Sequence, residues 1–261
     1  IVPQQLLRSG YTFKEAAILY GQLTGKAMVL INVPLTMSSA LCASLVPIIA
    51  ESHVLNKKAE VDSKVDMAMK VSMVIALPCT LGLSFMAAPI LNLLFPGHSE
   101  GFKILQYAAY TLPFIIVTQS TTSILQGTGY YMEPIKNMLI GCVGKIVITV
   151  LLVPIPFINI YGAIVGSMVA YIITSAANII TLKAKLGVRI NYYVVLIKPA
   201  YSAVFMILSG VFAYQYVYNN TMSNTLGIFA SIALGGIVYL VLIFLFGTFD
   251  YKYVKNKFAR G

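Results

Sequence analysis

Charged side chains are scarce in this chain: Asp, Glu, Lys and Arg together make up 10% of its 261 residues, whereas hydrophobic residues make up 59%. A soluble domain has roughly 25% charged residues, because its surface must be hydrated. Here there are too few polar side chains to cover a globule of this size, so lipid must replace water over much of the surface. The composition excludes an ordinary soluble protein and predicts an integral membrane protein.

Groupings of residues that support chemistry are also lacking. The three cysteines, Cys42, Cys79 and Cys142, lie far apart without CxxC or Cys/His spacing, which predicts neither a disulfide framework nor a zinc site. We expect the two histidines, His53 and His98, on opposite sides of the membrane, where they cannot share a metal or a proton relay. The eight acidic residues lie in loops or at helix ends, and no glycine-rich phosphate loop is present. We therefore expect no enzymatic activity, no cofactor and no metal.

The net charge of +10 raises the question of a nucleic-acid partner. The cations are spread over short loops and the C-terminal tail, and the aromatic residues lie at helix ends. A groove for nucleic acid would instead interleave cations with aromatic side chains. The distribution predicts that no nucleic acid is bound.

Long apolar runs are what the sequence has in abundance. Because a helix needs about 20 apolar residues to cross the hydrocarbon core, we predict transmembrane helices at 26–50, 71–94, 106–125, 137–155, 160–182, 198–217 and 225–247. The runs do not alternate residue by residue, which excludes the strands of a membrane barrel. The predicted fold is an all-α integral membrane protein with about seven transmembrane helices.

The cations divide unevenly between the two sets of loops. One set holds Arg8, Lys14, Lys26 and Lys103, and the other holds Lys57, Lys58, Lys64, Lys70, Lys136, Lys183, Lys185, Arg189, Lys198, Lys252, Lys255, Lys257 and Arg260. Cytoplasmic loops are enriched in Lys and Arg. This predicts that the second set, with the C-terminus, is cytoplasmic and that residue 1 is outside.

Two further helices are expected outside the spans. Segment 53–70 has one apolar face and two i,i+4 pairs, Glu60–Lys64 and Asp66–Lys70, which predicts a cytoplasmic amphipathic helix. Near 3–22, Thr12 precedes Glu15 by three residues, a capping-box pattern that predicts a short external helix.

Lys145 lies near the middle of the fourth predicted span, with no other charged residue in that span. An ammonium at this depth costs roughly 2.5–3.5 kcal/mol unless it faces protein or water. One interpretation is a cation that lines a cavity for an anionic substrate such as a pyrophosphate. The other is that its side chain reaches the cytoplasmic headgroups.

Polar residues inside other spans are a second group of candidates. Asn32 in the first span and Gln119 in the third are bulky enough to suggest a cavity, whereas the Ser and Thr residues around them favour helix packing. Gly162 and Gly166 form a GxxxG pattern typical of a close helix contact.

Several segments together resemble a known family. They are VPQQLLRSGYTFKEAAILYGQLTG, ALCASLVPIIAES, PILNLLFPG, ILQGTGYYMEPIKN and GKIVITVLLVPIPFINIYGAIVGSMVAY. In this order they resemble the second lobe of the stage V sporulation protein B and polysaccharide biosynthesis exporter family. That family belongs to the multidrug/oligosaccharidyl-lipid/polysaccharide flippase superfamily and is related to lipid II flippases. The resemblance covers about residues 2–185.

The resemblance implies that this chain is the C-terminal lobe of a two-lobe flippase of about fourteen helices, whose partner is a missing N-terminal lobe. Residues 1–185 would form the second-lobe helices, and 186–261 two extra transmembrane helices and a basic cytoplasmic tail. The implied function is alternating-access transport of an undecaprenyl-pyrophosphate-linked oligosaccharide or peptidoglycan precursor across the bacterial plasma membrane.

The resemblance also gives roles to individual residues. Lys145 occupies the family's lysine position after a glycine pair and would attract the pyrophosphate, while Asn32, Gln119 and Gln126 would contact sugar or peptide groups. The last two spans would form a groove for the polyprenyl tail. Family members often have Arg in place of Gln5 and Asn in place of Thr149, which leaves the exact substrate open.

Two other functions remain open. A multidrug exporter of the same superfamily would want a buried carboxylate for cationic drugs, and none lies in these spans. A non-transporting scaffold for envelope assembly would not need Lys145.

Overall fold

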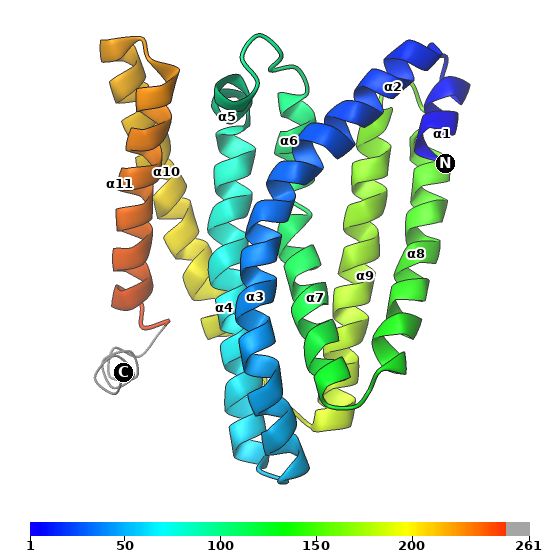
Figure 1. The fold of residues 1–261 in the computed structure, drawn as a ribbon, viewed down its shortest axis with the longest axis vertical. Helices are drawn as coiled ribbons and strands as arrows, with labels where there is room; N and C mark the ends of the chain where they lie inside the picture. Colours follow the sequence, from blue (N-terminus) through cyan, green and yellow to red (C-terminus); the bar gives the residue numbers. More distant parts are fainter. Residues whose placement is uncertain (249–261) are drawn as a thin grey trace.

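A computed structural model describes residues 1–248, and in this part of the chain all regular structure is helical (Figure 1). Six helical stretches among these residues are long and apolar enough to cross a membrane: Phe13–Val54, Lys58–Phe85, Met132–Leu152, Ile160–Leu186, Tyr193–Thr221 and Asn224–Leu245. The all-α membrane fold predicted from the sequence is therefore confirmed, with seven as an approximate number of crossings.

The third predicted span is broken into two short helices, α6 (Phe102–Ala109) and α7 (Leu112–Gly127). Pro113 stands at the start of α7, where its missing N–H does no harm, but within a continuous helix its ring would clash with the carbonyl of Ala109. The hydroxyl of Thr111 instead donates to the carbonyl of Ala108 at 2.6 Å. Neither piece is long enough to cross alone, because eight and sixteen residues span about 12 and 24 Å.

The N-terminal segment begins with α1 (Val2–Arg8) and α2 (Phe13–Gly21). The predicted capping box is present: the Thr12 amide donates to Glu15 Oε2 at 2.9 Å, and the Glu15 amide donates to Thr12 Oγ1 at 3.3 Å. However, α2 continues through a π-helical turn, η1 (Gln22–Ala27), into α3 (Met28–Val54). The helix expected near 3–22 is thus two pieces, of which the second is the upper part of the first span (Figure 1).

The segment 53–70 is not a separate helix. After α3 ends at Val54, a short turn leads into α4 (Lys58–Phe85), whose first half contains the rest of the segment. Its predicted apolar face is buried at Val61, Val65, Ala68 and Met69, whereas Val54 is 78% exposed. Residues 58–70 are therefore continuous with the helix of the second predicted span and pack against the bundle, which single-helix periodicity does not specify.

Only one of the two predicted ion pairs on α4 forms. Lys70 Nζ lies 2.9 Å from Asp66 Oδ2, as the i,i+4 spacing predicts. Glu60 instead contacts Lys57, at 3.8 Å, because the turn before α4 brings that side chain close.

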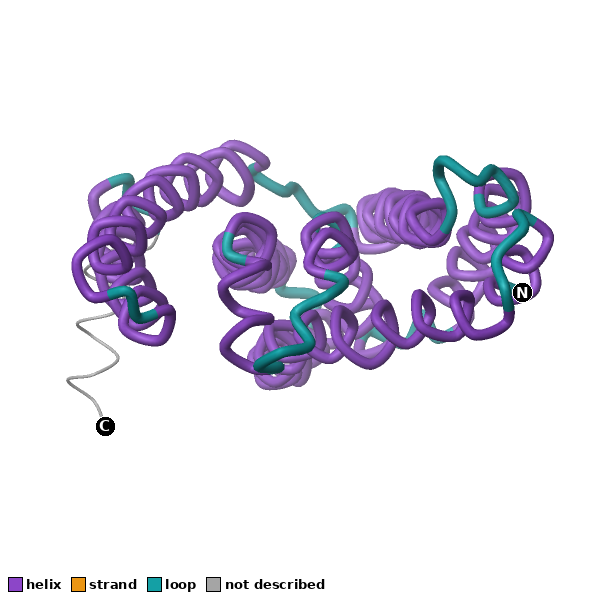
Figure 2. Tube along the Cα trace, turned by 90° about the horizontal axis from the view of Figure 1, so that it is seen from above, coloured by secondary structure: helices purple, strands orange, loops and turns teal. Residues whose placement is uncertain are grey.

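The helices form three groups across the molecule. The paired helices α8 (Met132–Leu152) and α9 (Ile160–Leu186) lie at one side, and α10 (Lys198–Thr221) with α11 (Asn224–Leu245) at the other (Figures 1 and 2). Between them, α3, α4 and α7 pack together around fully buried side chains such as Ile49, Val65 and Ile116. The short helix α5 (Ala87–Leu94) follows α4, and η2 (Tyr193–Ile197) leads into α10.

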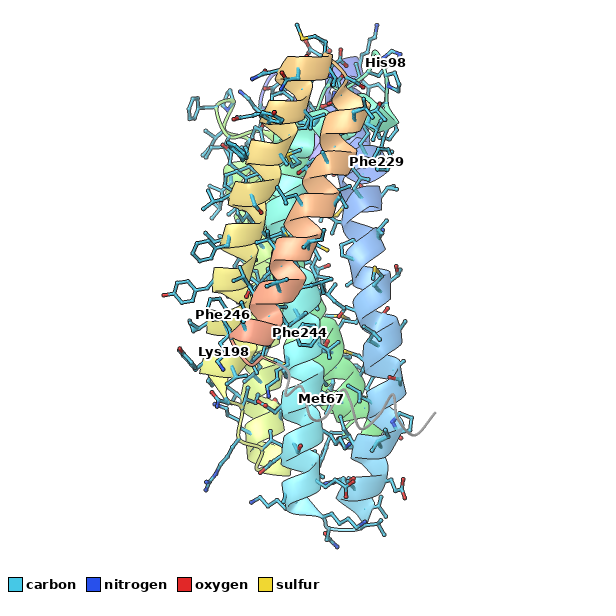
Figure 3. All side chains as sticks on the ribbon, turned by 90° about the vertical axis from the view of Figure 1, so that its left-hand side faces the viewer. Met67, His98, Lys198, Phe229, Phe244 and Phe246 are labelled. Atoms are coloured by element: carbon cyan, nitrogen blue, oxygen red, sulfur yellow. The ribbon has the colours of Figure 1, made fainter. Side chains whose placement is uncertain are left out.

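The two ends of the bundle differ in charge. The turns 55–57, 128–131 and 187–192 lie together at one end, which carries most of the cations; Lys198 lies toward that end and His98 at the other (Figures 1 and 3). We call the first of these the basic end. That it faces the cytoplasm remains a prediction. Lys252, Lys255, Lys257 and Arg260, in the predicted basic tail, lie outside the described residues.

Candidate functional site

An apolar groove of about 430 Å³ lies between α10 and α11 on one side and the rest of the bundle on the other. On one side it is lined by residues of α3, α4 and α5, among them Pro34, Cys79 and Ile90, and on the other by α10 and α11, among them Ile207 and Ile228. In Figure 3, α11 lies between α10 and α3, on the side of the molecule where the groove lies. The lining is almost entirely hydrocarbon, so the groove suits an apolar chain and not a hydrated solute.

Glycines on α10 and α11 determine where these helices are in close contact and where the groove stays open. A Cβ placed on Gly210 would lie 3.0 Å from Ser231 Oγ, and one on Gly235 would lie 3.2 Å from the carbonyl oxygen of Met206. These glycines let α10 and α11 pack closely as a pair. Gly236 also lines the groove, but its Cβ would meet nothing within 4 Å. The free space therefore lies on the side of α11 that carries Gly236.

Hydrogen bonds attach α11 to the rest of the bundle at two heights. The Tyr239 hydroxyl donates to the carbonyl of Val74 at 2.7 Å, and Asn224 Nδ2 donates to the carbonyl of Pro89 at 3.1 Å. The Val74 carbonyl is available because its usual helical donor, four residues later, is Pro78, which has no N–H. The proline thus creates an acceptor in α4, and the tyrosine of α11 satisfies it.

Replacing Tyr239 by phenylalanine is expected to lower the free energy of unfolding by roughly 1–3 kcal/mol, because it leaves a carbonyl unpaired where no water can replace the hydroxyl. Denaturant unfolding in detergent would measure the change. Tyr216→Phe is the matched control, since the Tyr216 side chain is 66% exposed and its hydroxyl makes no hydrogen bond to residues 1–248. Equal stability of the two variants would show that the Tyr239 bond contributes nothing.

Lys145 is exposed on α8, and its side chain makes no ion pair or hydrogen bond with any residue in the range 1–248. The helix begins at Met132, thirteen residues earlier, so Lys145 lies about 20 Å along the axis from the basic end of α8. A lysine side chain is much shorter than that distance. The other end of α8, at Leu152, is seven residues away or about 10 Å, so both interpretations of Lys145, a cation that lines a cavity and one that reaches headgroups, stay predictions.

The other three predicted contact residues lie on α3 and α7. Asn32 is exposed on α3, Gln126 is exposed at the end of α7, and Gln119 is half-buried on α7. The side-chain oxygen of Gln119 is buried and has no hydrogen-bond partner among residues 1–248. No hydrogen bond joins Asn32, Gln119, Gln126 and Lys145 to one another in this part of the chain, so they remain candidates on three separate helices.

Sequence analysis missed a buried amide network that joins α7, α8 and α9. Asn137 Nδ2 donates to Asn178 Oδ1 at 2.9 Å, and Asn178 Nδ2 donates to the hydroxyls of Thr121 and Thr122 at 3.1 and 3.0 Å. Asn178 is fully buried and Asn137 is 8% exposed. The signal was available, because an asparagine inside an apolar span needs a partner, but the sequence does not say which helix supplies it.

A second polar cluster joins α3, α4 and α7. The hydroxyls of Ser72 and Ser120 lie 2.7 Å apart, and Cys42 Sγ lies 3.1 Å from Ser120 Oγ. All three side chains are buried. Small polar residues here serve helix packing, as predicted for the serines of the third span.

The GxxxG pattern makes the predicted close contact, between α9 and α8. A Cβ on Gly162 would lie 2.8 Å from the backbone nitrogen of Val153, and one on Gly166 would lie 2.6 Å from Thr149 Oγ1. The two helices can approach this closely only because these positions lack side chains.

The two histidines lie at opposite ends of the bundle: His53 near the end of α3, and His98 between α5 and α6 (Figure 3). Within residues 1–248, no three His, Cys, Asp or Glu side chains gather as a metal-binding group. The conspicuous features of residues 1–248 are therefore the apolar groove, the lone Lys145 and the interhelical amide network.

The long apolar helices, together with the apolar groove and the isolated Lys145, define the chain as a multi-pass membrane protein. Three proteins of Bacillus subtilis are similar to it: the uncharacterised membrane protein YabM, 24% identical over 94% of this chain; stage V sporulation protein B, 22% identical over 94%; and the lipid II flippase MurJ, 24% identical over 81%. These similarities are consistent with the stage V sporulation protein B and lipid II flippase family. No model of a known protein family matches the chain.

The chain spans about half the length of the curated relatives that it matches: 46% of YabM, 47% of stage V sporulation protein B and 40% of the lipid II flippase.

Proposed function

We propose that the chain is the C-terminal lobe of a transporter that moves an undecaprenyl-pyrophosphate-linked oligosaccharide or peptidoglycan precursor across the bacterial plasma membrane, without covalent chemistry. The observation that carries the proposal is the apolar groove beside α10 and α11, in a chain similar to a lipid II flippase. A lipid-linked substrate has a long apolar tail and a charged, hydrated head. A protein that moves it needs separate surfaces for the two parts.

The groove is the proposed surface for the tail. Its walls come from α3, α4 and α5 on one side and from α10 and α11 on the other, and Ser231 is the only hydroxyl among its lining residues within the described chain. An apolar tail in this groove would leave no buried polar group unpaired along most of its length.

Lys145 is the proposed contact for the pyrophosphate. It is exposed on α8, about 20 Å from the basic end of that helix and without an anionic partner among residues 1–248. A cation held at such a depth is expensive unless it faces water or an anion. We propose that Lys145 faces a central cavity completed by an N-terminal lobe, with Asn32, Gln119 and Gln126 as contacts for sugar or peptide groups.

Alternating access between two lobes is the proposed mechanism. The N-terminal lobe is the proposed partner, which is supported by the share of the relatives that this chain spans. The basic end is the proposed cytoplasmic side, because Lys and Arg are enriched in cytoplasmic loops.

Filling the groove tests its role in transport. In the full-length protein, Gly236→Trp is expected to fold, because a Cβ at this position meets nothing within 4 Å, and to reduce transport at least about tenfold by occupying the space of the tail. The measurement is rescue of a bacterium depleted of its lipid II flippase. Leu240→Trp is the matched control on the same helix, because Leu240 is 58% exposed and does not line the groove.

Two outcomes would count against the proposal. If wild type, expressed at normal levels, fails to rescue, the substrate is not a peptidoglycan precursor. If Gly236→Trp rescues as well as Leu240→Trp, the groove does not carry the tail.

A further inference from the structure

A second, smaller pocket lies at the basic end, where α3, α4 and α9 meet. It has a volume of about 160 Å³ and is lined by Ser52, His53, Asn56, Lys58, Val61 and Leu186. Unlike the apolar groove, it has side-chain hydrogen-bond donors on four of its six lining residues: a hydroxyl, an imidazole, an amide and an ammonium. No Asp or Glu lies among these lining residues. The donor set is that of an anion site.

Two of these donors have no protein partner. Ser52 is 3% exposed as a residue, and its hydroxyl makes no hydrogen bond among residues 1–248, while the oxygen atom itself stays accessible from the pocket. Lys58 makes no ion pair in this part of the chain, whereas its neighbour Lys57 lies 3.8 Å from Glu60. An unpartnered hydroxyl inside the pocket and a free ammonium at its rim both favour an external anion.

The surrounding backbone places the Lys58 ammonium at this junction. Lys58 is the first residue of α4, which has no side-chain cap, so the positive end of the helix dipole adds to its charge. On the other side, a Cβ on Gly187, which ends α9, would lie 3.2 Å from Lys58 Nζ. Gly187 has a φ of +65°, so glycine suits both its backbone conformation and the close approach of the ammonium.

The depth of the pocket identifies the source of the anion. Ser52 and His53 follow Glu51, the first residue after the first predicted span, so the pocket is expected at the level of the headgroups. Next to them, at the turn after α3, Val54 and Leu55 are 78% and 53% exposed, so aliphatic side chains border the donors. Basic donors beside exposed aliphatic side chains match a lipid with a charged head.

We propose that this pocket binds a phosphate group, supplied by the headgroup of an anionic phospholipid, with Lys58 and Ser52 as its principal donors. The site is independent of the proposed transport function, because it lies outside both the apolar groove and the neighbourhood of Lys145. Free inorganic phosphate has the same chemistry and is the other source to be distinguished.

The test uses the full-length protein in detergent, with phosphatidylglycerol as the probe and phosphatidylcholine as the zwitterionic comparison. Native mass spectrometry would measure the lipid retained. Wild type is expected to retain phosphatidylglycerol over phosphatidylcholine, and Lys58→Gln to weaken that binding about tenfold, the effect of one lost charge-assisted hydrogen bond. Ser52→Ala is expected to weaken it about fivefold, and Lys58→Arg to retain it.

Lys57→Gln is the matched control, since it removes the same charge from the adjacent position, which does not line the pocket. Thermal unfolding of each variant would establish that it is folded, and Lys58→Arg keeps the test valid if Lys58→Gln is not. Competition by millimolar inorganic phosphate would support the phosphate site and show that a free anion also enters it. Equal retention by Lys58→Gln and wild type, or equal losses in Lys57→Gln and Lys58→Gln, would overturn the proposal.

Discussion

The full-length protein carrying Gly162→Leu is expected to disappear from the membrane fraction. Gly162 lies where α9 meets the end of α8, and a Cβ there would be 2.8 Å from the Val153 nitrogen and 2.9 Å from the Leu152 carbonyl carbon. These are backbone atoms, which cannot rotate away as the end of a flexible side chain can. Overpacking costs typically about 1–3 kcal/mol and more where nothing can move, enough to unfold a marginally stable protein. Immunoblotting of membranes would measure the level.

Gly236→Leu is the control for this substitution. It also adds a leucine to a glycine in an apolar helix, but a Cβ on Gly236 meets nothing within 4 Å, so we expect a level close to that of wild type. If Gly162→Leu accumulates as well as Gly236→Leu, α8 and α9 do not pack at the distance that the structure shows.

Loss of Lys145 is expected to have the second large effect. If its ammonium binds the pyrophosphate, Lys145→Ala should fail to rescue a flippase-depleted bacterium, with transport reduced at least about tenfold, because a charge-assisted bond is lost. Lys145→Arg keeps the charge but changes its geometry, so partial rescue is expected. Membrane levels of both variants must match wild type for the comparison to hold.

The alternatives to this role of Lys145 give different results. If alanine rescues as well as lysine, Lys145 does not bind the substrate, although transport itself stands. If wild type rescues and the arginine variant fails while alanine succeeds, a steric role replaces an electrostatic one. Lys136→Ala is a useful comparison, since Lys136 lies on the same helix but at the basic end, 3.5 Å from Glu133.

Composition and apolar runs were sufficient to predict the fold class, because membrane helices are specified mainly by length and hydropathy. The break between α6 and α7 was not predicted. Pro113 is visible in the sequence, but the apolar run continues on both sides of it, and hydropathy averages over the kink. The segment 53–70 was wrongly separated from α4, because its charges resemble those of a surface helix although its apolar face packs against the bundle.

Contacts between helices were the part of the candidate site that was hardest to predict from the sequence. The GxxxG contact was predictable, since the pattern itself requires a close neighbour. The Asn137–Asn178 bond was not, because it depends on which faces of α8 and α9 meet. Likewise, apolarity suggested a groove in the last two helices, but half of its wall comes from α3, α4 and α5, which are more than a hundred residues earlier in the sequence.

Pro78 leaves the carbonyl of Val74 without its helical donor, and Tyr239 binds it. This bond links the hydrogen bonding of α4 to the order in which the helices are synthesised. The tyrosine follows 165 residues later, so during translation α4 is made long before the donor that completes its hydrogen bonding. A nascent chain inserted only as far as α10 therefore carries an open backbone acceptor in its second crossing, in a solvent without water. Insertion of α11 closes that position, so the backbone hydrogen bonding of α4 is completed only when α11 packs beside it.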